Sequence, residues 1–359
     1  MDVTALRVLI AGGGTGGHLF PGLAIAEALR RRAPRADVRF VGSAYGIEHT
    51  AVPARGYRLY RLPVRGLYHV PLRRRLYVLA MAPLAVLRCV GILLTFRPHL
   101  VIGVGGYASG PMLATALLLG RRCVIQEQNA YPGLTNRLLG RWVRRAFVPV
   151  AGLDGIFPRA TVVGNPVRQD ILALRAEAST APREPLLLVV GGSQGAHRVN
   201  EALVEALPLL AGADLRILHQ TGPADLAWVR QAYQAAGVPA EIVAFIDDMA
   251  SAFRRCRLVV SRAGASAVAE IITARRAAIL VPIPGTSGDH QLKNAQWVAG
   301  AGAGVLLEQA QLSGAALARE ILALLGDGPR LARMEAATDA LYPGDAAARI
   351  VEECLGLLH

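Results

Sequence analysis

The stretch that decides the fold is Val8-Leu9-Ile10-Ala11, followed by Gly12-Gly13-Gly14-Thr15-Gly16-Gly17-His18 and then by Leu23-Ala24-Ile25-Ala26-Glu27-Ala28-Leu29. The apolar run predicts a buried strand, the glycines a tight loop, and the third segment a helix. Backbone N–H groups and the positive end of the helix dipole at such a loop favour an anionic ligand. A loop that only holds phosphate needs no titratable imidazole. His18 therefore indicates a site that takes a proton from a hydroxyl near neutral pH.

Strand, turn and helix patterns alternate along all 359 residues. The expected strands are residues 8–11, 38–41, 100–104, 123–126 and 146–148 in the first half, and residues 186–190, 215–219, 242–244, 258–261 and 278–281 in the second. Residues 187–196 repeat the amino-terminal strand and glycine turn. This alternation predicts an α/β protein of two Rossmann-like domains with doubly wound parallel sheets, with ligands in a cleft between them. We expect domains at 1–164 and 165–340, and a final helix in 341–359 that packs back on the first domain.

The excess positive charge lies in the first half of the chain. The net charge is +13, and residues 1–165 contain 22 arginines and six acidic residues, whereas residues 166–359 have a net charge of −3. Such asymmetry indicates a face that meets a polyanion, either nucleic acid or an anionic membrane surface. A codon pool that favours arginine explains why Lys293 is the single lysine, but it does not explain the difference between the halves.

An apolar segment follows the basic triplet Arg73-Arg74-Arg75, and its length suggests a membrane span. Against a span, Arg88 near its centre would cost roughly 2.5–3.5 kcal/mol in a bilayer, and Pro83 interrupts a helix. We therefore prefer helices of a soluble domain whose basic and apolar surface, around residues 72–97, lies on an anionic membrane. The alternative is a wholly buried core helix with a solvated basic flank.

The pattern Gly12-x-Gly14-x-x-Gly17 also satisfies the fingerprint of dinucleotide-binding enzymes. That fingerprint requires an acidic residue at the end of the second strand to hold a ribose. The strand here ends Phe40-Val41-Gly42-Ser43-Ala44 and has no such residue. An NAD- or FAD-dependent enzyme is therefore disfavoured.

Two further motifs follow predicted strands of the first half. The glycine-rich segment 103–111 would let a ligand approach the backbone, or it forms a tight turn before a helix that starts near Pro111. The polar segment 126–129 follows the next strand. Glu127 and Asn129 could bind sugar hydroxyls, or they could cap the following turn.

Two motifs of the second half also follow strands. Segment 261–270 opens a helix whose N–H groups suit a diphosphate, and Glu270 could accept hydrogen bonds from both hydroxyls of a ribose. Alternatively, Glu270 is an ordinary surface carboxylate. Segment 282–295 carries Asp289 and His290, but adjacent residues rarely ligate one ion, so metal binding is disfavoured.

Seven motifs occur in one order over nearly the whole chain. They are Gly-Gly-Thr-Gly-Gly-His with Phe20-Pro21-Gly22, Gly-Gly-Tyr-x-Ser-Gly-Pro at 105–111, Glu-Gln-Asn at 127–129 with Asn136-Arg137-Leu138, Gly-Asn-Pro-Val-Arg at 164–168, Gly-Gly-Ser-Gln-Gly-Ala at 191–196, Ser-Arg-Ala-Gly-Ala at 261–265 and Asp-His-Gln-x-x-Asn-Ala at 289–295. In this order they resemble the MurG family, bacterial glycosyltransferases of the GT-B fold that make lipid II for peptidoglycan. The resemblance implies inverting transfer of N-acetylglucosamine (GlcNAc) from UDP-GlcNAc to the C4 hydroxyl of the muramoyl sugar in lipid I. It implies no obligatory metal and no other cofactor.

The resemblance also implies a role for individual residues. His18 would be the catalytic base. The UDP-GlcNAc donor would contact Asn129, Arg168, Ser193, the Ile246 backbone, Ala265, Ser266, Ala267, Val268, Ala269, Glu270 and Gln291. The acceptor and its diphosphate would contact Gly14, Thr15, Gly16, Gly17, Tyr107, Glu127 and Asn136. The family often has threonine where this chain has Ala267, which puts a hydroxyl near the donor phosphates in doubt.

The partners implied by the resemblance are UDP-GlcNAc, lipid I, the anionic cytoplasmic face of the cell membrane and other cell-wall synthesis proteins. No nucleic acid partner is expected. The protein would be a peripheral membrane enzyme that serves cell-wall growth, cell shape and division. Two alternatives stay open: a GT-B transferase with another lipid acceptor such as diacylglycerol, and a nucleotide-binding module recruited to nucleic acid.

Overall fold

Strand β1 (Arg7–Ala11) is buried on both of its faces. Every residue from Val8 to Ala11 is fully buried, with Leu9 and Ala11 in one hydrophobic core and Val8 and Ile10 in another. Successive side chains of a strand point to opposite faces of the sheet. Helices must therefore cover both faces of the sheet that contains β1.

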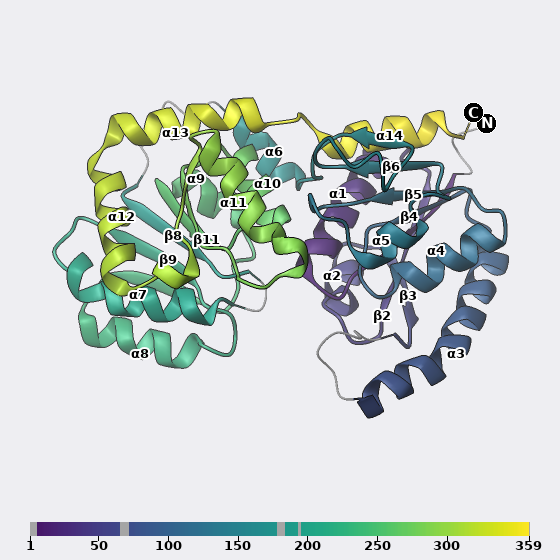
Figure 1. Ribbon diagram of the computed structural model, residues 1–359, viewed down its shortest axis with the longest axis horizontal. Helices are drawn as coiled ribbons and strands as arrows, with labels where there is room; N and C mark the ends of the chain where they lie inside the picture. Colours follow the sequence, from purple (N-terminus) through teal and green to yellow (C-terminus); the bar gives the residue numbers. More distant parts are fainter. Residues whose placement is uncertain (1–5, 65–71, 178–183, 193–194, 359) are drawn as a thin grey trace. The chain divides into compact units, whose positions relative to one another are not determined.

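The computed structural model describes residues 6–64, 72–177, 184–192 and 195–358 (Figure 1). The chain divides into two compact units, one formed by Met1–Arg168 with Pro343–His359 and the other by Gln169–Tyr342. The chain passes from one unit to the other after residues 168 and 342, whereas the boundaries expected from the sequence follow residues 164 and 340.

In the described residues of the first unit, seven parallel strands form one sheet in the order β3-β2-β1-β4-β5-β6-β7. The neighbours of β1 are β2 (Asp37–Ser43) and β4 (Leu100–Gly103), and the others are β3 (Arg58–Leu62), β5 (Cys123–Gln126), β6 (Arg145–Val148) and β7 (Ala160–Val162). The strand order reverses between β1 and β4. Open α/β sheets bind ligands beyond the carboxyl ends of the strands at such a point.

Two helical layers cover this sheet. Buried residues of α1 (Gly16–Arg32) and α14 (Ala346–Gly356) share one core with Val8 and Ile10, and α14 packs along α1 (Figure 1). Buried residues of α3 (Leu72–Phe96) and α4 (Ser109–Leu118) share the other core with Leu9 and Ala11. Short helices α2 (Glu48–Ala54) and α5 (Leu134–Leu139) lie in loops that follow β2 and β5.

Helix α3 differs from its prediction because it continues without a break through Pro83. Among its described side chains, residues 80–96, the buried ones are spaced three or four apart and form one face, namely Ala85, Cys89, Leu93 and Phe96. Large apolar residues elsewhere on the helix are exposed, with exposed fractions of 41% for Leu84, 67% for Leu87 and 53% for Leu94. The alternative of a wholly buried helix is therefore wrong. No helix in the described residues is long and apolar enough to cross a membrane.

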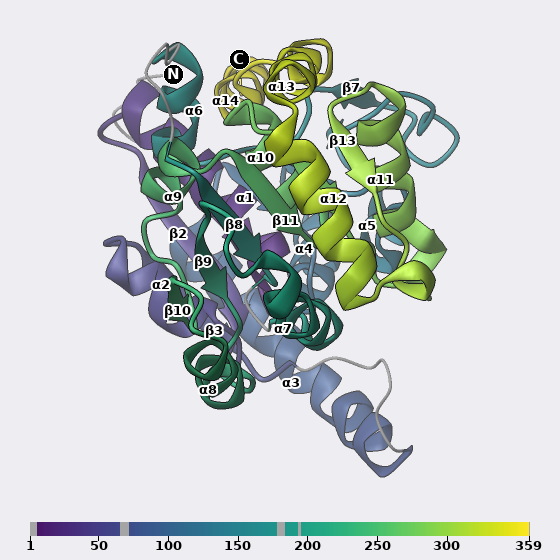
Figure 2. The ribbon, with the colours of Figure 1, turned by 90° about the vertical axis from the view of Figure 1, so that its left-hand side faces the viewer.

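In the described residues of the second unit, six parallel strands form a sheet in the order β10-β9-β8-β11-β12-β13 (Figure 2). These strands are β8 (Leu186–Val190), β9 (Arg216–Gln220), β10 (Ala240–Val243), β11 (Leu258–Ser261), β12 (Ala278–Leu280) and β13 (Gly304–Leu306). Counted from β8, the order is 3-2-1-4-5-6, as in Rossmann folds. The switch point lies between β8 and β11. No strand is predicted from the sequence at β3, β7 or β13, all of which are edge strands.

The helices of the second unit also form two layers. One core joins β8, β9 and β11 with four helices, α7 (His197–Leu210), α8 (Leu226–Ala236), α12 (Gly314–Gly326) and α13 (Gly328–Leu341). The remaining helices are α6 (Gln169–Ala176), α9 (Met249–Arg255), α10 (Ala265–Thr273) and α11 (His290–Gly300). Two 3-10 turns, η2 (Ser287–Asp289) and η3 (Gln309–Gln311), lie in loops.

Candidate functional site

The loops that follow β1 and β4 pack directly on each other at the switch point of the first unit. A Cβ atom added to Gly106 would lie 2.1 Å from the carbonyl oxygen of Gly13. Gly106 also has a φ of +80°, which favours glycine. The glycines of segment 103–111 therefore serve the close approach of two loops, and together the loops form one surface at the carboxyl edge of the sheet.

A buried carboxylate supports the amino-terminal glycine loop. Glu48 is fully buried, its Oε2 accepts the N–H of Gly14 at 2.8 Å, and its Oε1 accepts the N–H of Ser43 at 2.7 Å. A Cβ on Gly13 would lie 2.6 Å from the carboxyl carbon. The N–H of Gly14, expected to bind the acceptor diphosphate, is therefore already used. Glu48 is not among the site residues predicted from the sequence, where the signal for it is the pair of glycines at positions 42 and 46 that make room for its side chain.

His18 lies in the first turn of α1, which begins just after Thr15. The Nδ1 atom of His18 lies 3.1 Å from Oγ1 of Thr15. On its other side the ring lies against Gly105, where an added Cβ would meet Cδ2 at 2.6 Å. Thr15 and Gly17 are exposed and Gly16 is buried. The loop thus presents an oriented imidazole rather than only a row of amides.

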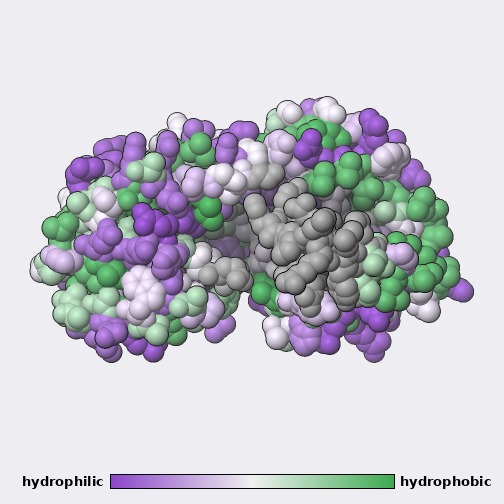
Figure 3. Space-filling model, turned by 60° about the horizontal axis from the view of Figure 1, so that its bottom comes forward, coloured by the Kyte–Doolittle hydropathy of each residue, from purple (hydrophilic) through white to green (hydrophobic). Residues whose placement is uncertain are grey.

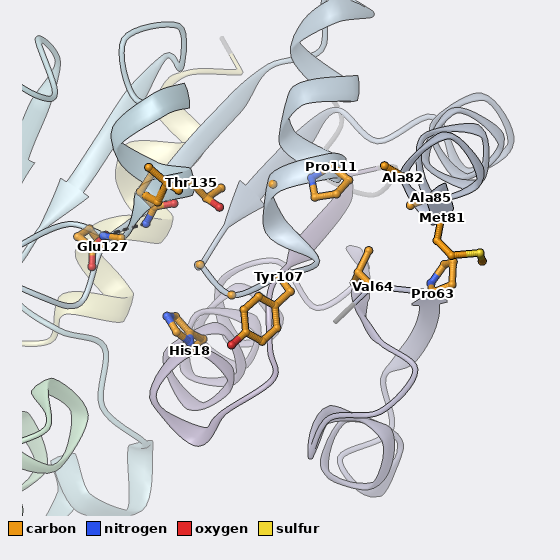
Figure 4. Close-up of a pocket in the computed structure, with 16 residues that line it drawn as sticks. His18, Pro63, Val64, Met81, Ala82, Ala85, Tyr107, Pro111, Glu127 and Thr135 are labelled. Carbon is orange, nitrogen blue, oxygen red and sulfur yellow. Dashed lines mark hydrogen bonds between the residues drawn. The ribbon is translucent and has the colours of Figure 1, made fainter. Parts of the chain in front are cut away.

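His18 lines a pocket of about 410 Å³ in the first unit (Figure 4). Three other residues expected in the acceptor site line the same pocket, namely Tyr107, Glu127 and Asn136. The opposite wall is apolar and comes from the end of β3 and from α3, with Pro63, Val64, Met81, Ala82 and Ala85. Figure 4 shows His18 and Tyr107 side by side, with Met81 and Pro63 toward the far end. The pocket therefore suits a ligand with one polar and one apolar part.

Glu127 is the first residue of the loop after β5, and its side chain binds the backbone of that loop. Its carboxylate accepts the backbone N–H groups of Gln128 and Asn129 at 2.9 Å and of Gly133 at 3.0 Å. It also accepts the side-chain amide of Asn136 at 2.9 Å. Burial raises the pKa of Glu127, and these hydrogen bonds oppose that effect. For Glu127, these hydrogen bonds agree with the interpretation that it caps the following turn. Asn129 is half-buried, so its side chain can still contact a ligand.

In the second unit the loop after β11 leads into α10. This helix contains the residues expected to contact the donor, Ala265, Ser266, Ala267, Val268, Ala269 and Glu270. The first N–H groups of any helix lack partners within it, so they point toward a ligand at its start. The Val268 side chain is buried and its N–H already donates to the Gly264 carbonyl at 2.9 Å, so the N–H groups that can meet a ligand are those before Val268. Glu270 is half-buried, one turn into the helix.

A buried cation lies beside this loop. The Arg262 side chain is only 8% exposed, and its Nη1 donates to the carbonyl oxygens of Val281 at 3.2 Å and Pro282 at 3.4 Å. Burial lowers the pKa of Arg262 to about 10, so the guanidinium is still charged at neutral pH. Arg262 is part of the Ser-Arg-Ala-Gly-Ala motif, but the sequence predicts no role for it. A fixed positive charge at this edge favours an anionic ligand.

Three further residues of the second half are expected to contact the donor, namely Ile246, Gln291 and Ser193. The Ile246 N–H donates to Oε1 of Gln220 at 3.1 Å, so a contact with uracil must come from the Ile246 carbonyl. Gln291 lies in the first turn of α11 and accepts the Ile283 N–H at 3.0 Å. Ser193 lies outside the described residues, as do the side chains of the basic triplet 73–75.

Arg168 belongs to the first unit, although the sequence predicts it in the domain 165–340. Its Cζ lies 5.7 Å from the centroid of the Phe20 ring. The chain remains within the first unit until residue 168 because the segment after β7 stays bonded to the sheet. The N–H of Val163 donates to the Val148 carbonyl of β6 at 3.0 Å, and the side-chain amide of Asn165 donates to the Gln128 carbonyl, in the loop after β5, at 2.9 Å.

Two family models match this chain. Residues 8–148 match the glycosyltransferase family 28 N-terminal domain, and residues 186–350 match the C-terminal domain of the same family. A relative from Anaeromyxobacter sp. (strain K), named UDP-N-acetylglucosamine--N-acetylmuramyl-(pentapeptide) pyrophosphoryl-undecaprenol N-acetylglucosamine transferase, is 44% identical over 99% of this chain and 94% of its own length. A relative of the same name from Syntrophotalea carbinolica is 45% identical over 97% of this chain and 98% of its own length.

Solved structures agree with this relationship. The crystal structure of Acinetobacter baumannii MurG matches with a TM-score of 0.73 and 28% identity, over 97% of this chain and 98% of that one. The glycosyltransferase of kitacinnamycin has a TM-score of 0.73 at 16% identity, a likeness of fold alone. The chain therefore belongs to glycosyltransferase family 28 and, within it, to the MurG group of N-acetylglucosamine transferases with the two-sheet GT-B fold.

Proposed function

We propose that the protein transfers GlcNAc from UDP-GlcNAc to the C4 hydroxyl of the muramoyl sugar in lipid I, with inversion at the anomeric carbon. The bond between that carbon and the UDP oxygen breaks, a bond to O4 forms, and UDP leaves. The observation that carries the proposal is the pocket lined by His18, Tyr107, Glu127 and Asn136. It occurs in a chain 44% identical to a relative named as an N-acetylglucosamine transferase. Lipid II is then the product.

His18 is the proposed base. A sugar hydroxyl is a weak nucleophile, and removal of its proton during attack typically accelerates a reaction by about 10²–10⁴-fold. Two groups in the described wall of the pocket can act as a base, His18 and Glu127. The Glu127 carboxylate accepts several hydrogen bonds from its own loop, whereas the half-buried imidazole of His18 is held by contacts on two sides. The polar end of the pocket suits the sugar, and the apolar end suits the less polar part of the acceptor.

The second unit is the proposed donor site. Glu270 would hold the ribose, the Ile246 carbonyl the uracil, and the N–H groups of 265–267 the diphosphate. Arg262 adds a buried positive charge near the same loop. Arg168 and Ser193 are proposed to contact the diphosphate as well, and Asn129 and Gln291 the GlcNAc hydroxyls. As the leaving UDP gains negative charge, Arg168, Arg262 and the N–H groups of 265–267 stabilise it without a metal ion.

The first unit is proposed to lie on the anionic cytoplasmic face of the cell membrane. Figure 3 shows apolar residues gathered on the right-hand part of the first unit. Exposed apolar side chains of α3, α4, α5 and the turn after α5 include Leu84, Leu87, Leu94, Leu118, Leu138 and Trp142. Arginines 137 and 141 flank the last two of these in the sequence. Apolar contact and attraction to anionic lipid together support peripheral binding, and contact with other cell-wall synthesis proteins is part of the same proposal.

The test of the reaction is product analysis with UDP-GlcNAc and a lipid I analogue. We expect one GlcNAc added through a β-linkage to O4, with one UDP released per transfer. Diacylglycerol offered as acceptor should remain unchanged. Transfer to diacylglycerol, a retained anomeric configuration, or linkage to another hydroxyl would contradict the proposal.

The test of the surface is sedimentation with vesicles that contain or lack anionic lipid. We expect binding to vesicles with anionic lipid, reduced several-fold in Leu87→Ser. Leu322→Ser is the matched control because Leu322 is also an exposed helical leucine, 39% exposed, but lies in the second unit. Equal loss in both variants would contradict the assignment of the surface.

A further inference from the structure

Thr15 occupies the residue position that normally caps a helix, yet its hydroxyl does not cap α1. Its backbone is extended, with φ −139° and ψ 160°, as at an N-cap. The hydroxyl of a threonine at that position usually accepts a backbone N–H of the first turn, and this hydrogen bond stabilises the helix. In this chain the side chain makes no such bond and lies instead 3.1 Å from Nδ1 of His18. The hydroxyl is therefore turned from the helix backbone to the imidazole.

The contact with Thr15 selects one orientation of the His18 ring. A flip of the ring exchanges Nδ1 with Cδ2 and would lose the hydrogen bond. On the opposite side, an added Cβ at Gly105 would lie 3.1 Å from Nε2. Gly105 has a φ of +84° and no side chain, so the ring can lie there. Nδ1 therefore faces Thr15, and the edge with Nε2 faces the loop that lines the pocket.

The partner of Nδ1 also bears on which nitrogen can accept a proton. A neutral imidazole has one N–H and one lone pair, and a base uses the lone pair. We propose that Thr15 is a positioning residue, whose hydroxyl accepts the Nδ1–H of His18 and so keeps the lone pair on Nε2 for the acceptor hydroxyl. This inference rests on the proposed role of His18 as the base.

The proton balance of the step follows. The proton of the C4 hydroxyl moves to Nε2 while O4 bonds to the anomeric carbon and the UDP oxygen takes the electron pair of the broken bond. His18 becomes an imidazolium whose Nδ1–H still donates to Thr15. Because the partner is a neutral hydroxyl, it stabilises the imidazolium less than a carboxylate would. His18 can therefore release the proton to water or UDP before the next turnover.

The direct test is NMR of the full chain with ¹⁵N-labelled histidine. Two-bond correlations between ring nitrogens and carbon-bound protons identify the protonated nitrogen, and the spectrum of His18→Gln assigns the His18 signals. We expect Nδ1–H in the wild type above the pKa of the ring. In Thr15→Val, which keeps the shape and loses the hydroxyl, the Nε2–H form should increase several-fold relative to Nδ1–H. A wild type with Nε2–H, or an unchanged ratio in the variant, would overturn the proposal.

Kinetics provide the second readout. Thr15→Val should lower kcat several-fold and alter the acidic limb of its pH profile, with the KM for UDP-GlcNAc unchanged, and Thr15→Ser should restore both. Thr50→Val is the matched control, because Thr50 is an exposed threonine of α2 whose hydroxyl bonds only the Ile47 carbonyl among the described contacts. If Thr15→Val lowered thermal stability but left the tautomer and pH profile unchanged, Thr15 would be merely structural. If instead His18→Ala kept full turnover, the proposed base would be wrong, while the NMR result would still report what Thr15 does to the ring.

Discussion

The two units contain the same local motif with opposite charges behind it. In the first unit, β1 leads into a glycine loop and α1, and the buried carboxylate of Glu48 binds the loop from behind. In the second unit, β11 leads into a glycine turn and α10, and the buried guanidinium of Arg262 lies at the base of the turn. From the sequence, both motifs are equally suited to phosphate.

This difference shows that a strand, a glycine loop and a helix start do not by themselves specify an anion site. A buried negative charge opposes the positive end of the helix dipole, and a buried positive charge adds to it. The first loop is therefore better suited to a neutral sugar hydroxyl and to an imidazole that becomes positive during the reaction. The second is better suited to a diphosphate.

The largest expected effect is that of His18→Ala on turnover. Loss of a general base should lower kcat by about 10²–10⁴-fold while the Kd for UDP-GlcNAc stays unchanged. Steady-state kinetics and calorimetric titration of the donor measure the two quantities. His49→Ala is the control, since His49 is exposed in the same unit. A weakened donor affinity with unchanged kcat would reverse the assignment of the loops.

Next is Glu48→Gln, which removes the charge behind the first loop. One N–H of the new amide must face the N–H of Gly14 or Ser43, so we expect a loss of about 3 kcal/mol in the free energy of unfolding. Chemical denaturation measures this loss. Glu352→Gln, at an exposed ion pair with Arg32 in the same unit, should cost less than about 1 kcal/mol. Equal costs would mean that the buried carboxylate does not organise the loop.

Glu270→Ala should affect donor binding rather than turnover. Loss of charged hydrogen bonds to a ribose should raise the KM for UDP-GlcNAc about 10- to 100-fold, with a small change in kcat. Initial rates over a range of donor concentrations separate the two parameters, with the exposed Glu308→Ala as the control. If kcat fell and KM did not change, Glu270 would not belong to the ribose site.

The smallest expected effect is a difference in acid stability between the units. His219 in the second unit is fully buried between Asn200 and Tyr233, and burial lowers its pKa to about 3. The unfolded chain binds a proton below about pH 6.5 that the folded unit does not, so stability falls as pH drops from 6.5 toward 3. The loss is about 2 kcal/mol at pH 5. No histidine of the first unit is fully buried among the described residues.

Acid unfolding can be followed by fluorescence of Trp142→Phe, in which Trp228 and Trp297, both in the second unit, are the remaining tryptophans. We expect this unit to unfold at a higher pH than the first, and His219→Gln to remove the dependence. A first unit that unfolds at the higher pH would contradict the prediction.

The sequence predicts the central strands of both sheets but not three of the four edge strands. β1 and β8 are continuous apolar runs because both of their faces are buried. β3, Arg58–Leu62, has exposed or half-buried residues at every position but the last, and β7 and β13 are three residues long without a buried residue. Such segments form strands because a neighbouring strand supplies hydrogen bonds, which is information that a local pattern does not contain.

The polar groups behind the site are harder to predict than the site itself. His18 is conspicuous in a glycine loop, and Tyr107, Glu127 and Asn136 lie at strand ends where ligands bind. Glu48 is an ordinary residue of a short helix until the fold brings its carboxylate under Gly13 and Gly14. Pro83 indicated a break in α3, yet the helix continues because the apolar face around it packs on the sheet.

The most direct test of the assignment is backbone hydrogen exchange with and without UDP, which carries the uracil, the ribose and the diphosphate but no GlcNAc. We predict slower exchange of amides in residues 264–270 and 244–246 of the second unit, and unchanged exchange in residues 12–18 of the first. Protection of residues 12–18 by UDP, with no change at 264–270, would contradict the account and return the nucleotide to the first loop.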